Sequence, residues 1–183
     1  IRDRVQVDDE GRQFECFVDQ QEHPQWLQRM AAAMRASRPA SWYAQQIAAG
    51  IGRIEAATVE QFVPQMLNYD LTGHISFSKG CYTGQEVIAR LHYRGKAKRR
   101  MHRVELCATD LADGMVPAAG TSLFFAGDGQ AVGTVVNGAR TDTGGVAALV
   151  VAPDAAVAKG LRLGGADGPA LHPRPLPYPL PPA

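Results

Sequence analysis

Short apolar segments separated by glycine and aspartate dominate the chain after about residue 97, and they constrain the fold most strongly. The segments are Met101–Cys107, Thr121–Phe125, Ala131–Val136 and Val146–Val151. Short strands bounded by turn residues at this spacing are typical of small antiparallel barrels or sandwiches. We therefore predict a β-barrel over residues 104–172, with a domain boundary near residue 103. The proline-rich residues 173–183 are expected to form an extended surface tail, because proline is excluded from helix interiors and central strands.

The N-terminal third shows hairpin and helix patterns. Alternation in Arg4–Val7 and Gln13–Val18, around Asp8–Gly11, predicts a β-hairpin. Pro24 suits the first position of a helix, with His23 as its cap and Pro39 as its end. Helical spacing predicts one buried stripe for that helix, formed by Trp26, Leu27, Met30, Ala31 and Met34.

The middle of the chain is expected to be less regular. A short helix should follow Ser41 and stop at Gly50, and Pro64 prevents a long helix within residues 51–78. Ile75–Phe77 is expected to be extended. Val87, Ile88 and Leu91 then share one face of a helix that ends at Gly95.

Composition excludes several classes of protein. The 183 residues carry 19 basic and 18 acidic side chains, so no overall field directs the chain to nucleic acid or membrane. Its three cysteines lack paired spacing, which argues against a disulfide framework and against a self-contained metal site. We expect Cys16 and Cys107 to be buried, inert thiols and the protein to be cytoplasmic, with no membrane-spanning segment and no metal site.

The stretch Lys79–Glu86 concentrates chemistry in eight residues. Thr83 and Glu86 have the spacing of a capping box, which places Cys81 just before a helix N-terminus where a thiolate is favoured. The ammonium group of Lys79 would also favour the negatively charged thiolate of Cys81. Arg90 can pair with Glu86 on one helix face. These residues predict a functional thiol at Cys81, with Lys79, Glu86 and Arg90 shaping its site.

The same stretch, Lys-Gly-Cys-Tyr-Thr-Gly-Gln-Glu followed by Arg90, resembles the signature of the YgfZ family. These proteins are relatives of the glycine-cleavage aminomethyltransferase (GcvT). Similar flanking stretches are Phe62–Met66, Ile75–Phe77 and Tyr93–Gly95. The resemblance is dense over residues 40–105 and looser to about residue 165.

The resemblance implies a fold, a ligand and a role. The implied fold class is α+β, with aminomethyltransferase-like, ferredoxin-like folate-binding lobes before the β-barrel. Residues 1–103 would be the later part of the folate-binding region, and the chain would be a fragment without its N-terminal lobe. The implied role is that of a tetrahydrofolate-binding accessory protein for iron–sulfur cluster assembly or repair, including in tRNA-thiolating enzymes. Its implied partners are polyglutamylated folate, iron–sulfur client or assembly proteins, and a transient cluster. The folate contacts would be Trp42, Tyr82, Gly84 and Gln85.

Two alternative functions stay open. The first is aminomethyl transfer to folate, although Ala48 stands where the aminomethyltransferases typically carry a glutamate, which favours a non-enzymatic role. The second is tRNA binding by a basic run over residues 90–103. Its members are Arg90, Arg94, Lys96, Lys98, Arg99, Arg100 and Arg103. Such a run can bind phosphates or the polyglutamate tail of folate, and on a strand Lys98 and Arg100 would share one face.

Overall fold

The computed structural model describes residues 3–6, 14–19, 21–111, 115–141 and 144–181. The chain forms two compact units, residues 1–42 and 43–183. In the first unit, β1 (Asp3–Gln6) and β2 (Phe14–Phe17) pair as antiparallel strands. The two strands of the predicted hairpin are therefore confirmed, whereas the turn Asp8–Gly11 lies outside the described residues.

Helix α1 (Pro24–Ala33) begins at the predicted proline but differs from the prediction in two ways. None of its ten residues, all of which the structure describes, is buried, so the predicted buried stripe is wrong. His23 occupies the N-cap position, but its side chain makes no capping hydrogen bond to the described residues. Pro39 begins the next helix, α2 (Pro39–Ala48), because proline fits the first turn of a helix as well as the position after its end.

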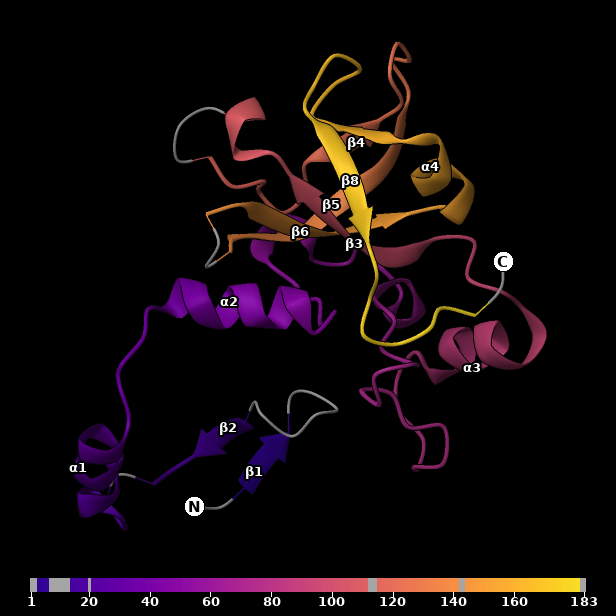
Figure 1. Ribbon diagram of the computed structural model, residues 1–183. Coiled ribbons are helices and arrows are strands. Elements are labelled where there is room, and N and C mark those ends of the chain that lie inside the picture. The colour runs from indigo at the N-terminus through magenta and orange to yellow at the C-terminus, as the bar shows by residue number, and fades with distance from the viewer. Residues whose placement is uncertain (1–2, 7–13, 20, 112–114, 142–143, 182–183) are drawn as a thin grey trace. The chain divides into compact units, whose positions relative to one another are not determined.

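The second unit is built on a closed antiparallel barrel (Figure 1). Its strands are β3 (Arg100–Leu106), β4 (Ser122–Phe124), β5 (Ala131–Arg140), β6 (Val146–Ala152), β7 (Leu161–Leu163) and β8 (Ala170–Arg174). They pair in the order β3-β6-β5-β4-β7-β8, and β8 closes the barrel against β3. The predicted barrel is confirmed, whereas β7, β8 and the short helix α4 (Asp154–Lys159) were not foreseen. The predicted boundary near residue 103 falls inside β3.

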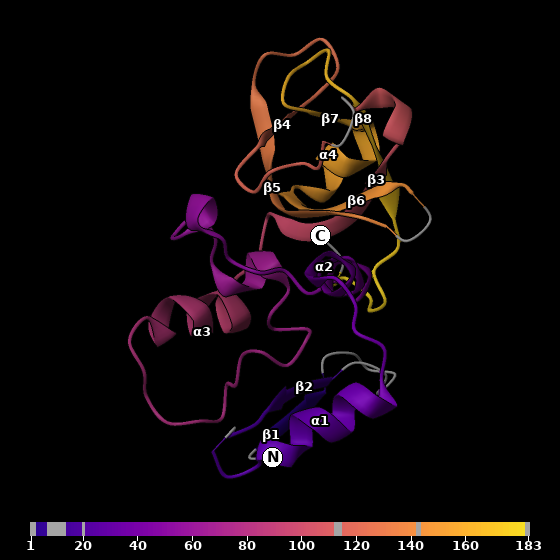
Figure 2. The same ribbon diagram turned by 90° about the vertical axis from the view of Figure 1, so that its left-hand side faces the viewer.

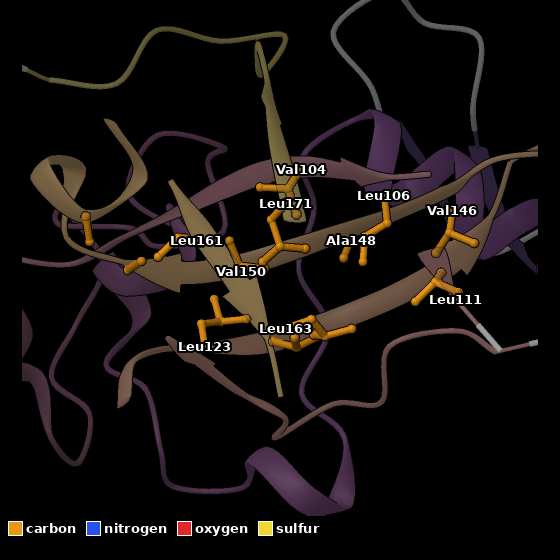
Figure 3. Packing of buried hydrophobic residues seen from close by; sticks show 13 residues of the cluster. Val104, Leu106, Leu111, Leu123, Val146, Ala148, Val150, Leu161, Leu163 and Leu171 are labelled. Carbon is orange, nitrogen blue, oxygen red and sulfur yellow. The ribbon is translucent and has the colours of Figure 1, made fainter. Parts of the chain in front are cut away.

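Strand β6 is buried on both faces. Val146, Ala148 and Val150 point into a cluster that fills the barrel (Figure 3), and Ala152 belongs to the same cluster. Ala147, Leu149 and Val151 alternate with them and belong to a second cluster outside the barrel wall. The second cluster is covered by Ile47, Leu67 and Leu176, among others. Burial on both faces explains why β6 reads as a continuous apolar run instead of an apolar–polar alternation.

The segment between α2 and the barrel contains little regular structure, as predicted. It holds the 3₁₀ turns η1 (Ala56–Thr58) and η2 (Pro64–Leu67), followed by helix α3 (Gln85–Arg94). A third turn, η3 (Ala108–Asp110), follows β3. Ile75–Phe77, all described, forms no strand, so that expectation is wrong. Figure 2 shows α3 and its preceding loop outside the barrel strands.

Residues 173–181 are more than the predicted surface tail. Pro173 lies in β8 opposite Val104, where β8 pairs with β3, and the β7 pairing has already ended at Leu171. A proline is tolerated there because one edge of the strand needs no donor at that position. Leu176 then packs on the second apolar cluster. The C-terminal segment therefore contributes to the core.

Candidate functional site

The signature segment Lys79–Gly84 forms an irregular loop that leads directly into α3. Cys81 is exposed and its thiol is free. Gly84 has a φ of 85°, in the left-handed region that glycine adopts without strain. A Cβ atom added at Gly84 would meet no atom within 4 Å, so the backbone conformation and not crowding favours glycine there. The loop thus presents Cys81 to solvent immediately before a helix.

The capping box predicted between Thr83 and Glu86 is wrong. Gly84 occupies the N-cap position, and no side chain caps it among the described residues. The backbone N–H of Tyr82 instead donates to Oε1 of Gln85, over 3.1 Å. Because Gly84 turns the chain in the left-handed conformation, the helix begins one residue later than a box starting at Thr83 requires. Gln85, a predicted folate contact, therefore ties the loop to the helix.

The predicted neighbours of Cys81 are arranged differently from the expectation. Lys79 Nζ lies 4.7 Å from the centroid of the Tyr82 ring, a cation–π distance. Glu86 and Arg90 are both exposed, and the described side chains show no ion pair between them. The expected Glu86–Arg90 bridge is therefore wrong, since an exposed pair gains too little to fix two long side chains. The structure therefore brings Tyr82 into contact with two other predicted site residues, Lys79 and Gln85.

Helix α3 rests on the 3₁₀ turn η2. Gln65, 2% exposed, donates from Nε2 to the carbonyl oxygen of Ile88 over 2.7 Å. Ile88 and Leu91 are half-buried, as their shared face predicts, whereas Val87 is 59% exposed. A buried glutamine amide thus fixes the middle of the helix that carries the signature.

A salt bridge lies beneath the end of the same helix. Arg100 donates to both carboxylate oxygens of Asp70, over 2.8 and 3.0 Å, and also to the carbonyl oxygen of Gln65. The two side chains are only 12% and 9% exposed. They line a groove of about 350 Å³ together with Leu91, His92 and Pro181, among others. Sequence reasoning missed this pair, because no fixed spacing links residues 30 positions apart.

Helix α2 carries the other residues predicted to bear on folate. Trp42 is half-buried in the first unit, and Ala48 is exposed at the end of the helix. Gly50 has a φ of 67° and stops the helix as predicted. Its carbonyl oxygen accepts a 2.5 Å hydrogen bond from Tyr178, and burial raises the pKa of that hydroxyl. No local pattern in the sequence indicates this contact, because the two residues are 128 positions apart.

Comparison with known proteins places the chain in a family. The chain is 34% identical over 173 residues to the tRNA-modifying protein YgfZ of Yersinia pestis (strain Pestoides F), an alignment that covers 93% of the chain and 51% of that protein. It is 37% identical over 141 residues to the tRNA-modifying protein YgfZ of Escherichia coli O139:H28, which covers 76% of the chain and 42% of that protein. The chain belongs to the YgfZ family. No protein-family model matches it. The chain spans about half the length of the curated YgfZ relatives it matches.

The basic run that the resemblance left unexplained separates into two groups. Arg100 pairs with Asp70, and Arg103 lies 3.2 Å from Glu105, so both are engaged within the fold. Arg90, Arg94, Lys98 and Arg99 are exposed, and the described part of the chain offers them no ion pair. Lys98 lies before β3 begins, so the predicted common strand face with Arg100 is wrong. The exposed side chains of the run, Lys96 among them, are accessible to an anionic ligand.

Further observations concern a titratable pair, metal-binding groups, the other cysteines and membrane-spanning helices. His102 Nε2 lies 3.1 Å from Asp154 Oδ1, and burial lowers the pKa of His102 despite this carboxylate. Among the described residues, no group of three or more His, Cys, Asp or Glu side chains could hold a metal ion. Cys107 is exposed just after β3, so its predicted burial is wrong, and the side chain of Cys16 lies outside the described parts. No described helix is long and apolar enough to cross a membrane.

Proposed function

We propose that this chain supports tRNA modification as part of a tetrahydrofolate-binding accessory protein, which assembles or repairs iron–sulfur clusters in tRNA-thiolating enzymes. The observation that carries the proposal is the exposed, free thiol of Cys81 in the Lys79–Glu86 signature. The name of the relatives, tRNA-modifying protein YgfZ, supports the link to tRNA modification. The cluster role and the folate ligand come from the family resemblance.

The thiol is suited to exchange chemistry with a partner molecule. An exposed cysteine on a loop can ligate a cluster, carry a persulfide or form a mixed disulfide, because each of these requires access to the sulfur. Cys81 lies three residues before Gly84, the N-cap of α3. The contact with Tyr82 keeps the side chain of Lys79 against the loop. Cys81 is therefore the proposed functional thiol.

The residues proposed to hold folate offer suitable chemistry. Tyr82 is half-buried under a lysine ammonium, an arrangement that suits a ligand with an aromatic ring and a glutamate carboxylate. Trp42 provides a half-buried indole. Gly84 leaves space beside its Cα. Exposed Ala48 offers no carboxylate to a pterin, which supports binding over aminomethyl transfer.

Replacement of single cysteines tests the role of the thiol. In cells that lack the endogenous protein, Cys81→Ser should abolish the support of tRNA thiolation, measured as thiolated nucleosides by mass spectrometry. Cys107→Ser is the matched control, because Cys107 is also exposed and free but lies after β3. If Cys81→Ser supports thiolation as well as the parent protein does, the proposed role of Cys81 is wrong.

Titration with tetrahydrofolate tests the ligand. Trp42→Ala should weaken binding about tenfold or more, as loss of one stacking ring predicts. Trp26→Ala is the control, since Trp26 is the other tryptophan of the chain and lies in α1. Equal affinities for the two variants and the parent would remove Trp42 from the folate site.

A further inference from the structure

Three aromatic rings gather at the C-terminal end of α3. The rings of Phe77 and His92 stack, with centroids 3.8 Å apart and planes inclined by 19°. Tyr93 contacts both rings edge-on, with centroids 6.3 Å from Phe77 and 4.7 Å from His92. Tyr93 is nevertheless 70% exposed. The cluster holds this ring in a fixed orientation and leaves it open to solvent.

Cationic residues lie near Tyr93 on the same helix and in the loop that follows it. Arg90, Tyr93 and Arg94 have the i, i+3, i+4 spacing that places side chains on one helix face. Lys98 and Arg99 follow in the loop that connects α3 to β3. These four cations of residues 90–103 are exposed and have no ion pair within the described part of the chain. Glu86, one helical turn before Arg90, is the acidic side chain of α3.

We propose that this ring–cation surface, formed by Phe77, Arg90, His92, Tyr93, Arg94, Lys98 and Arg99, binds single-stranded RNA. One base stacks on Tyr93, and the cations contact the phosphates on either side. Stacking platforms flanked by positive charge are the usual way in which proteins bind single strands, because every base has an aromatic face and every nucleotide a phosphate. An acidic protein partner would engage the cations but would leave the rings unused.

The inference deepens the proposed function by adding a direct contact with RNA. The choice of RNA as the partner rests on the proposed role in tRNA modification, whereas the composition of the surface does not depend on it. None of its residues belongs to the stretch Lys79–Glu86, and Arg90 is the residue that it shares with the predicted surroundings of Cys81.

The aromatic half of the inference is tested by fluorescence anisotropy with the intact protein and a labelled single-stranded RNA of about 12 nucleotides. Tyr93→Ala should weaken binding about 5- to 100-fold, and Tyr93→Phe should bind within about threefold of the parent. Tyr43→Ala is the control and should bind like the parent. Tyr43 is 40% exposed, with the Arg53 guanidinium 4.0 Å from its ring, but it lies on α2.

The charged half is tested by the dependence of affinity on salt. The logarithm of the binding constant falls as the logarithm of the salt concentration rises. Removal of one phosphate contact, as in Arg94→Gln, should make this negative slope shallower by about 0.7. The same change at Lys159, an exposed cation on α4, should leave the slope unchanged. An unchanged slope in Arg94→Gln would overturn the proposed phosphate contacts.

Three results would overturn the inference as a whole. They are RNA affinity that is unchanged in Tyr93→Ala, tighter binding of duplex than of single-stranded RNA, and competitive displacement of the RNA by polyglutamylated folate. Cys81→Ser separates the inference from the proposed function, because it should bind RNA like the parent while losing support of thiolation. If Cys81→Ser supports thiolation, the proposed function fails independently of RNA binding.

Discussion

Strand β6 and helix α3 belong to the same compact unit, yet they differ completely in burial. All seven residues of β6 are buried. None of the ten residues of α3, all of them described, is buried. The free energy of folding of this unit must therefore come mainly from the barrel and its covering residues, because buried apolar area is the dominant favourable term. The side chains of helix α3 and its preceding loop contribute less to stability, so their identities can be determined by what they bind.

The largest expected effect is on the free energy of unfolding, and it is tested with one side chain from each element. Leu149→Ala should lower the free energy of unfolding by about 2–5 kcal/mol, because it leaves a cavity in the outer cluster. Val87→Ala on α3 should change it by less than about 0.5 kcal/mol, since Val87 is 59% exposed. Chemical denaturation of the two variants measures both values. Similar losses in the two variants would remove the contrast between the elements.

A smaller effect is expected where the C-terminal segment closes the unit. Tyr178→Phe removes the donor to the Gly50 carbonyl oxygen and should cost about 1–2 kcal/mol. Because burial raises the pKa of Tyr178, the parent should also lose stability as the pH rises above 10, where the unfolded chain ionises first. Denaturation at neutral and alkaline pH measures both effects. If Tyr178→Phe is as stable as the parent protein, the hydrogen bond to Gly50 does not contribute to stability.

The signature loop should respond to backbone conformation and not to packing. Gly84→Ala should cost about 1 kcal/mol, because alanine is strained at a φ of 85°. Gly80→Ala is the control, since Gly80 also has open space but no left-handed φ, and it should cost nothing. Urea denaturation compares the two variants. Equal stability of both would show that the left-handed turn does not fix the start of α3.

The pH dependence of stability isolates one buried group of the barrel. Burial lowers the pKa of His102 below its ordinary value of 6.5, although Asp154 acts in the opposite direction. Below about pH 6.5 the unfolded chain therefore binds a proton more readily than the folded one, and the free energy of unfolding falls as the pH falls. His102→Gln should therefore flatten this dependence. An unaltered pH profile in His102→Gln would exclude His102 as its source.

The barrel could be predicted from the sequence because its strongest strands carry their pattern locally. Val146–Val151 is continuously apolar, and glycine-rich turns separate it from its neighbours. β7 spans only three residues, and β8 contains Pro173, so neither carries enough periodicity to be found alone. The prediction of a buried stripe on α1 was wrong for a different reason, although its pattern is clear. Helical spacing of Trp26, Met30 and Met34 shows that one face is apolar but does not show what covers it.

The candidate site was predictable in its composition and not in its contacts. The signature identified Cys81 and a loop before a helix, and both are present. The capping box failed because Gly84 adopts a left-handed conformation, which a Thr-x-x-Glu spacing alone does not reveal. The buried links beneath α3, such as Gln65 to Ile88, join residues far apart in the chain. Their partners depend on the tertiary fold and carry no signal in the local sequence.

Native-state hydrogen exchange tests most directly whether the signature segment opens independently of the barrel. The amide of Val150 in β6 should exchange only through global unfolding of the unit. The amide of Ala89 in α3 should exchange through a local opening whose free energy is lower by about 2 kcal/mol or more. Equal opening free energies for the two amides would contradict the account, because α3 and the barrel would then be a single cooperative structure.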